Sequence, residues 1–110
     1  MTEDVRVSAP VQAVVDAINA ADTDAFVNAF TEDGVVDDWG RRLSGAAGVR
    51  DWANTDAIGA GAQMTVTGAE VRGPVTHLRF GWRSRVFNGE SEAFVTVRDD
   101  KVSEFRIPAG

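Results

Sequence analysis

The dipeptide Asn88–Gly89 separates two stretches in which apolar and polar residues alternate, residues 75–87 and residues 90–98. Asn and Gly both adopt positive φ readily, and a two-residue type I′ turn requires positive φ at both of its positions. The pattern therefore predicts a long antiparallel hairpin with a defined register. The pairs that this register predicts are Phe87 with Glu90, Arg85 with Glu92, Trp82 with Val95, and Phe80 with Val97.

Alternation assigns the side chains of this hairpin to two faces. One face is predicted to be covered by helices, and it carries Leu78, Phe80, Trp82, Ser84, Val86, Ser91, Ala93, Val95 and Val97. The other face mixes charged and aromatic side chains, namely His77, Arg79, Arg83, Arg85, Phe87, Glu90, Glu92, Phe94, Thr96 and Arg98. We expect this second face to lie away from the helices.

Two helices are predicted before the strands begin. The first has its apolar residues at i, i+3, i+4 and i+7, namely Val11, Val14, Val15 and Ile18. It is expected to begin near Ser8 or Ala9 and to end at about Ala21, because Pro10 fits only in the first turn of a helix. A cap at Asp22 or Thr23 is predicted to start a second, shorter helix, with the apolar residues Phe26, Val27 and Phe30.

The remaining elements complete an α+β pattern. A short strand is predicted at 35–39, and Ser44–Gly45 opens a third helix that continues through Trp52. The Gly- and Ala-rich residues 56–61 are expected to form a flexible connector at the rim of a pocket. Further strands are predicted at 63–72, 75–87, 90–98 and 101–107. Helices followed by antiparallel strands predict one α+β domain over residues 1–110.

Composition excludes several classes of function. The net charge of −6 argues against a nucleic-acid partner, because such affinity comes largely from Lys and Arg. The absence of cysteine excludes disulfides, thiolate metal sites and thiol catalysis. No apolar run approaches the roughly 18 residues of a membrane span, so no membrane partner is expected. Residues 1–10 lack the apolar core of a signal peptide, which predicts a cytoplasmic location.

Neither a metal nor a cofactor is predicted. His77 is the only histidine, so a site with several histidine ligands cannot form. The glycines at 45–48 and 59–61 lack the strand–loop–helix setting of a phosphate-binding loop.

The segment "DTDAFVNAFTEDGVVDDWGRRLSGAAGVRDW" resembles the nuclear transport factor 2-like superfamily. The shared features are a short helix ending in Phe30, the acidic pair Glu32–Asp33, a strand to Asp38, and Gly45 before the third helix. The resemblance implies a cone-shaped fold, in which three N-terminal helices pack on a strongly curved, mostly antiparallel sheet around an apolar pocket. Its nearest chemical models are the SnoaL-like polyketide cyclases and the ketosteroid isomerases.

The resemblance places Asp38 where the isomerases have their general base, a mechanism taken from that family. Asp38 is therefore the candidate catalytic residue; the alternative is a strand-end acid that is solvated or paired with Arg41 or Arg42. Val14 matches the position of the isomerases' tyrosine, and Ala93 matches that of their protonated aspartate. A steroid isomerase of the known type is therefore not expected.

A small hydrophobic ligand is the predicted partner. The residues expected to contact it are Val14, Ile18, Phe30, Trp52, Met64, Phe80, Trp82, Ser84, Ser91 and Ala93. Ordinary core packing is the alternative for the apolar members, and bonds to nearby backbone are the alternative for the serines. Trp39 and Phe26 are further aromatic candidates for the cavity wall.

Two hypotheses follow from these features. The first is a cofactor-independent isomerase- or cyclase-type enzyme in which Asp38 transfers a proton, with Ser84 or Ser91 assisting. The second is a non-catalytic binding or dimerisation module of the same fold. The aromatic and Arg-rich outer face predicts a homodimer under either hypothesis.

Overall fold

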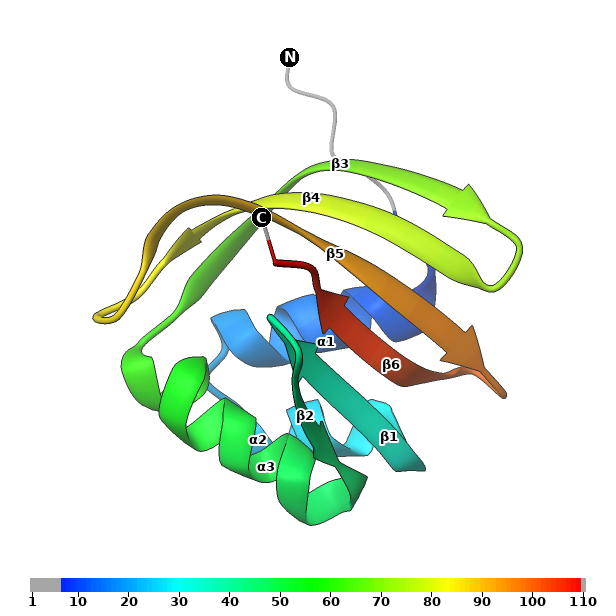
Figure 1. Cartoon of the computed structure of the whole chain (residues 1–110), viewed down its shortest axis with the longest axis horizontal. Helices are drawn as coiled ribbons and strands as arrows, with labels where there is room; N and C mark the ends of the chain where they lie inside the picture. Colours follow the sequence, from blue (N-terminus) through cyan, green and yellow to red (C-terminus); the bar gives the residue numbers. More distant parts are fainter. Residues whose placement is uncertain (1–6, 110) are drawn as a thin grey trace.

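Residues 7–109, which the computed structural model describes, form three α-helices, a short 3₁₀ helix and one six-stranded sheet (Figure 1). The predicted α+β class is confirmed. The elements in chain order are α1 (Ala9–Asn19), α2 (Thr23–Asn28), β1 (Phe30–Asp38), β2 (Arg41–Ser44), α3 (Gly45–Asp56), the 3₁₀ helix (Ile58–Ala60), β3 (Gln63–Arg72), β4 (Val75–Arg83), β5 (Asn88–Arg98) and β6 (Lys101–Ile107).

The sheet curves over the helices with the strand order β2-β1-β6-β5-β4-β3 (Figure 1). Every neighbouring pair is antiparallel except β1 and β6, which run parallel. The prediction of a mostly antiparallel sheet covered by three helices is therefore confirmed. Within residues 7–109, no helix is long and apolar enough to cross a membrane.

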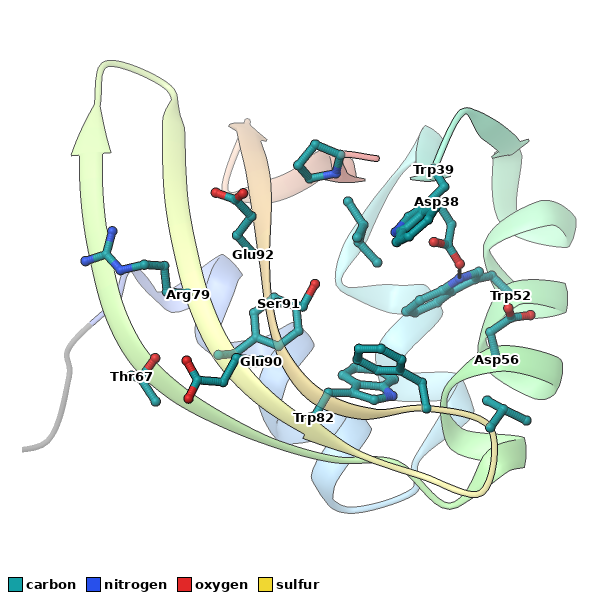
Figure 2. A pocket seen from close by; sticks show the side chains of 15 residues that line it. Asp38, Trp39, Trp52, Asp56, Thr67, Arg79, Trp82, Glu90, Ser91 and Glu92 are labelled. Carbon is teal, nitrogen blue, oxygen red and sulfur yellow. Dashed lines mark hydrogen bonds between the residues drawn. The ribbon is translucent and has the colours of Figure 1, made fainter. Parts of the chain in front are cut away.

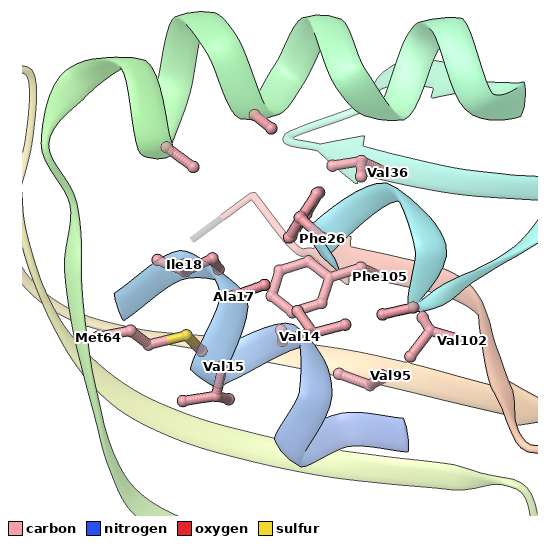
Figure 3. Packing of buried hydrophobic residues seen from close by; sticks show 14 of the residues in the cluster. Val14, Val15, Ala17, Ile18, Phe26, Val36, Met64, Val95, Val102 and Phe105 are labelled. Carbon is pink, nitrogen blue, oxygen red and sulfur yellow. The ribbon is translucent and has the colours of Figure 1, made fainter. Parts of the chain in front are cut away.

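Helix α1 lies across the inner face of the sheet and supplies one side of the core. Its predicted apolar stripe is buried throughout, with Val11, Val14 and Ile18 fully inaccessible to solvent. Pro10 lies in the first turn, as its missing N–H requires. Figure 3 shows this stripe packed with residues of the sheet and of α2, including Phe26, Val95 and Phe105.

The predicted register of the β4–β5 hairpin is wrong. Arg83 pairs with Asn88, and residues 84–87 form the loop. Ser84 stabilises this longer loop: its N–H donates to the Phe87 carbonyl at 3.0 Å, and its Oγ accepts from the N–H groups of Val86 and Phe87. These bonds satisfy the loop backbone, so Asn88 begins the strand instead of making the turn.

The correct register still leaves the predicted faces unchanged for the residues that remain in β4 and β5. Phe80 pairs with Ser91 instead of Val97, a difference of an even number of positions. Side chains alternate with a period of two, so an even shift keeps each one on its face. Glu92 pairs with Arg79 and not with Arg85, which lies in the loop.

A two-residue turn of the predicted kind occurs elsewhere, between β1 and β2. Trp39 and Gly40 have φ values of 54° and 87°, and Asp38 pairs with Arg41 across them. Strand β2 was not predicted, because its four residues carry only one apolar side chain, Leu43. Strand β1 also begins earlier than predicted, at Phe30, which was assigned to the helix before it.

The sheet is incomplete beside the first half of β5. Residues 94–96 of β5 pair with both β4 and β6, whereas residues 88–93 pair only with β4. Strand β6 ends at Ile107, and Pro108 follows, which has no N–H to continue the ladder. One edge of β5 is therefore left without a neighbouring strand, and the candidate site lies at this opening.

Asn19 joins the end of α1 to β3, and its loss is predicted to destabilise the fold. Its side-chain nitrogen donates to the Met64 carbonyl at 2.8 Å, and its Oδ1 accepts from the Met64 N–H at 2.7 Å. Asn19→Ala leaves both backbone groups unsatisfied, so the free energy of unfolding should fall by about 1–3 kcal/mol. Urea unfolding followed by circular dichroism measures this change.

The matched control is Asn54→Ala, which removes an exposed amide from α3. Its unfolding free energy should stay within about 0.5 kcal/mol of the parent value. Equal effects of the two substitutions would contradict the role assigned to Asn19.

Candidate functional site

A cavity of about 790 Å³ opens between α3, the end of β1 and the inner face of β4 and β5. It extends around the unpaired edge of β5 toward the outer face of the sheet (Figure 2). Its walls are formed by Asp38, Trp39, Trp52, Asp56, Thr67, Arg79, Phe80, Trp82, Val86, Phe87, Glu90, Ser91, Glu92, Ile107 and Pro108. The volume is ample for a small organic molecule.

Asp38 is the last residue of β1, and its carboxylate lies on the cavity wall. The indole Nε1 of Trp52 donates a hydrogen bond to its Oδ2 at 3.0 Å. The Arg41 guanidinium lies 3.6 Å from the same oxygen. The side chain retains 24% of its solvent exposure. No hydrogen bond to Oδ1 occurs within residues 7–109, and Figure 2 shows this oxygen directed toward the cavity.

The hydrophobic core holds Trp52 in the orientation that this bond requires. Trp52 is only 1% exposed, and its ring contacts aromatic rings on three sides. The ring centroids of Phe26, Phe105 and Trp82 lie 5.8, 6.0 and 6.1 Å away. The indole is thus fixed by packing, and its single N–H points out of the core at Asp38 (Figure 2).

Asp37 lies on the opposite face of β1, as alternation predicts, and has a structural role. Its two oxygens accept from Arg42 and from the Gly40 N–H, both at 2.9 Å. Arg42 also bonds Glu104 at 3.1 Å, and these two carboxylates, first Glu104 and then Asp37, raise the pKa of Arg42. Of the two adjacent acids, Asp37 therefore stabilises the turn, and Asp38 lines the cavity.

The wall facing Asp38 is apolar on its inner side and charged at its outer end. Phe80 and Trp82 form the apolar part, with ring centroids 6.0 Å apart, and Ser91 adds a hydroxyl beside them. At the outer end, Arg79 bonds Glu70 at 3.2 Å, and its guanidinium lowers the pKa of that carboxyl below the ordinary value. A ligand here would meet an aromatic surface with polar groups at its margin.

The β4–β5 loop forms one lip of the cavity. Val86 and Phe87 are largely exposed and contribute apolar side chains to the mouth. The neighbouring Arg85 fastens the loop to the connector after α3: its N–H donates to the Ala60 carbonyl at 2.9 Å, and its guanidinium donates to the Gly59 carbonyl. Within residues 56–61, which were predicted as a pocket rim, Gly59 and Ala60 therefore support this loop, and Asp56 lines the cavity.

The structure divides the predicted site residues into two groups. The group that lines the cavity consists of Asp38, Trp52, Phe80, Trp82 and Ser91. Another group lies in the hydrophobic core and not on the cavity wall, and consists of Val14, Ile18, Phe30, Met64 and Ala93. Alternation identified the inner face, but it does not show which part of that face α1 covers.

The prediction that Ser84 lies on the covered face of strand 75–87 is wrong, because β4 ends at Arg83. Its hydroxyl donates to the Phe87 carbonyl within the β4–β5 loop, and the residue is absent from the cavity wall. The incorrect hairpin register produced this error, because it extended β4 past Arg83.

Several lining residues were not predicted. They are Thr67, Arg79, Val86, Phe87, Glu90, Glu92, Ile107 and Pro108. Asp56 was expected only as part of the rim segment, and Trp39 was only an additional candidate. Outer-face residues reach the cavity because the sheet is open beside β5. No local pattern in the sequence predicts that opening. Trp39 did carry a signal, since a tryptophan before a glycine is an unusual turn residue.

His77 lies on the outer face, as predicted, and outside the cavity wall. Its ring stacks on Phe94 with centroids 4.5 Å apart, and its Nε2 lies 2.6 Å from Glu92. Arg106 covers the Phe94 ring at 4.7 Å. The outer face therefore carries an aromatic and charged stack at its centre.

No protein-family model and no curated protein match the chain. Its shape, however, matches solved structures along nearly the whole length. A proposed polyketide cyclase from Sinorhizobium meliloti superposes with a TM-score of 0.81 and 24% identity, covering 92% of this chain and 94% of that one. A nuclear transport factor 2-like protein from Cytophaga hutchinsonii gives a TM-score of 0.79 and 10% identity, covering 97% and 92%. This chain has the nuclear transport factor 2-like fold.

A third structure with this fold contains a small molecule. The protein of ketosteroid isomerase-like fold from Catenulispora acidiphila, in complex with trimethylamine, gives a TM-score of 0.78 and 18% identity, with 96% and 88% of the two chains covered. The fold implied by the resemblance in the sequence is therefore confirmed. Because the nuclear transport factor 2-like fold supports many chemistries, function has to be argued from the cavity itself.

The Trp52–Asp38 hydrogen bond is predicted to stabilise the fold measurably. Trp52→Phe keeps an aromatic ring in the core but removes the donor to the carboxylate. Trp82→Phe makes the same change of ring at a position where no bond to the indole nitrogen is found within residues 7–109. The first variant should therefore lose about 1–2 kcal/mol more unfolding free energy than the second.

Urea unfolding of both variants, followed by far-ultraviolet circular dichroism, tests this difference. Equal losses would show that the bond to Asp38 contributes nothing beyond ring packing.

Proposed function

We propose that this chain binds a small, mainly apolar molecule in the cavity and that Asp38 transfers a proton to or from it. The observation that carries the proposal is the carboxylate of Asp38. It presents one oxygen to an aromatic-walled cavity while the other is held by Trp52 at 3.0 Å. A carboxylate oriented in this way beside an apolar surface is equipped for general acid–base chemistry.

The geometry suits abstraction of a proton from a carbon next to a carbonyl group. In this step the C–H bond breaks, an O–H bond forms on Oδ1 of Asp38, and the electron pair moves onto the carbonyl oxygen. In the proposed step the hydroxyl of Ser91, which also lines the cavity, donates a hydrogen bond to that oxygen. Return of the proton at another carbon gives isomerisation, and attack of the enolate on a second carbonyl gives ring closure.

Two structural neighbours support this proposal. The protein from Sinorhizobium meliloti is a proposed polyketide cyclase, and ring closure of polyketides uses the enolate chemistry described above. The protein from Catenulispora acidiphila contains trimethylamine, so a chain with this fold holds a small molecule. Neither metal nor cofactor is required for the proposed step.

Proton exchange provides a direct test of the catalytic role. In deuterated buffer, the chain should accelerate incorporation of deuterium next to the carbonyl of a bicyclic ketone such as 2-tetralone, measured by proton NMR. Asp38→Asn removes the base, so the protein-dependent exchange rate should fall by at least about 100-fold.

Asp51→Asn is the matched control, because this acid lies exposed on α3 outside the cavity. It should exchange at the parent rate. Unchanged exchange in Asp38→Asn would exclude the catalytic role. If that variant still bound 2-tetralone, the cavity would be a binding site without proton transfer.

We also propose a homodimer formed through the outer face, centred on the stack of His77, Phe94 and Arg106. Aromatic and arginine side chains are enriched at such interfaces. Phe94→Glu should convert the dimer to a monomer in sedimentation velocity at micromolar concentration, whereas Val71→Glu on exposed β3 should not. A monomeric parent chain under these conditions would contradict the proposal.

A further inference from the structure

The cavity combines aromatic rings with an excess of negative charge. Within residues 7–109, five aromatic side chains and four carboxylates line it, against the single guanidinium of Arg79. Arg79 is itself bonded to Glu70 at 3.2 Å. Arg41 is shared between two of the lining acids, at 2.8 Å from Asp56 and 3.6 Å from Asp38. These arginines leave the lining carboxylates in excess.

We propose that the molecule bound in this cavity carries a protonated amine or a quaternary ammonium group on an apolar body. The faces of indole and phenyl rings attract organic cations, and desolvation strengthens this attraction. Carboxylates around the same space attract the cation and oppose an anion. The inference rests on the proposed function, because it names the ligand class of the same cavity.

Neighbouring aromatic rings form a wall on which the apolar part of the ligand can lie. Trp52 and Trp82 have ring centroids 6.1 Å apart, and Phe80 lies 6.0 Å from Trp82. This surface begins beside Asp38, where Trp52 donates its hydrogen bond. The apolar body of the ligand would lie on these rings, and the cationic group would lie toward the carboxylates at the margin.

Trp39 supplies an aromatic ring at the mouth of the cavity, next to Asp38 (Figure 2). Its backbone has a φ of 54°, and its side chain is 65% exposed. Burial does not explain why a tryptophan occurs at this position, because the residue is exposed. The turn does not explain it either, because Asn or Gly adopts positive φ with less strain. Contact between the indole face and a bound cation gives the side chain a function at this position.

Three probes that share one apolar body test the ligand class. They are (2-naphthylmethyl)trimethylammonium, 2-naphthylmethanol and 2-naphthoate, titrated into the protein by calorimetry at pH 7 and low ionic strength. The ammonium probe should bind at least about tenfold more tightly than the alcohol, and the carboxylate most weakly. Raising the ionic strength should weaken binding of the ammonium probe most.

Equal affinity for the ammonium probe and the alcohol would overturn the inference while leaving a cavity that binds neutral molecules. Failure of all three probes to bind would overturn it as well. The proton-exchange assay uses a different compound, so loss of the catalytic role of Asp38 is detected separately and leaves the preference for cations intact.

Substitution of Trp39 distinguishes a ligand contact from a structural role. Trp39→Asn should raise the urea midpoint, because Asn suits the positive φ, and should weaken binding of the ammonium probe by at least about fivefold. Val71→Thr, which alters another exposed apolar residue on β3, should change neither quantity. Undiminished ammonium binding by Trp39→Asn would overturn the role proposed for Trp39.

Discussion

The hydrogen bond from Trp52 to Asp38 joins the core of this protein to its cavity. On one side the indole is packed among Phe26, Phe105 and Trp82, so the ring cannot turn without disturbing the core. Its N–H emerges from that packing and is satisfied by the carboxylate at the end of β1. A buried indole donor needs such a partner, and the partner is thereby oriented. Core stability and the geometry of the candidate site are therefore coupled through one side chain.

The cavity exists because the sheet stops short beside β5. Strand β6 ends before Pro108, and residues 88–93 of β5 have a strand neighbour on one edge only. The space that a longer β6 would fill is bounded instead by α3, the end of β1 and the β4–β5 loop. This opening also brings outer-face acids, Glu90 and Glu92, into contact with the same space as the inner aromatic rings. A mixed aromatic and acidic lining follows from the topology.

Local patterns in the sequence predicted much of the fold. The apolar period of α1, the capping residue Asp22, and the bounds of β3 and β6 all agree with the structure. These features depend on residues close together in the chain, so a sequence pattern contains the necessary information. The resemblance to a known family predicted the fold and identified Asp38 as the candidate catalytic residue.

The sequence by itself determined the type of most elements, β2 excepted, and the face on which the residues of β4 and β5 lie, because both follow from the spacing of neighbouring residues. Tertiary structure alone decided the register of β4 and β5, where Ser84 stabilises a longer loop than Asn88–Gly89 would make. It also decided which inner-face residues line the cavity: Ala93 is buried in the core, whereas Ser91 lies on the cavity wall. The position of the loop depends on a distant segment as well, because Arg85 bonds the Ala60 and Gly59 carbonyls. The lining of the cavity depends on where α1 crosses the sheet and where β6 stops.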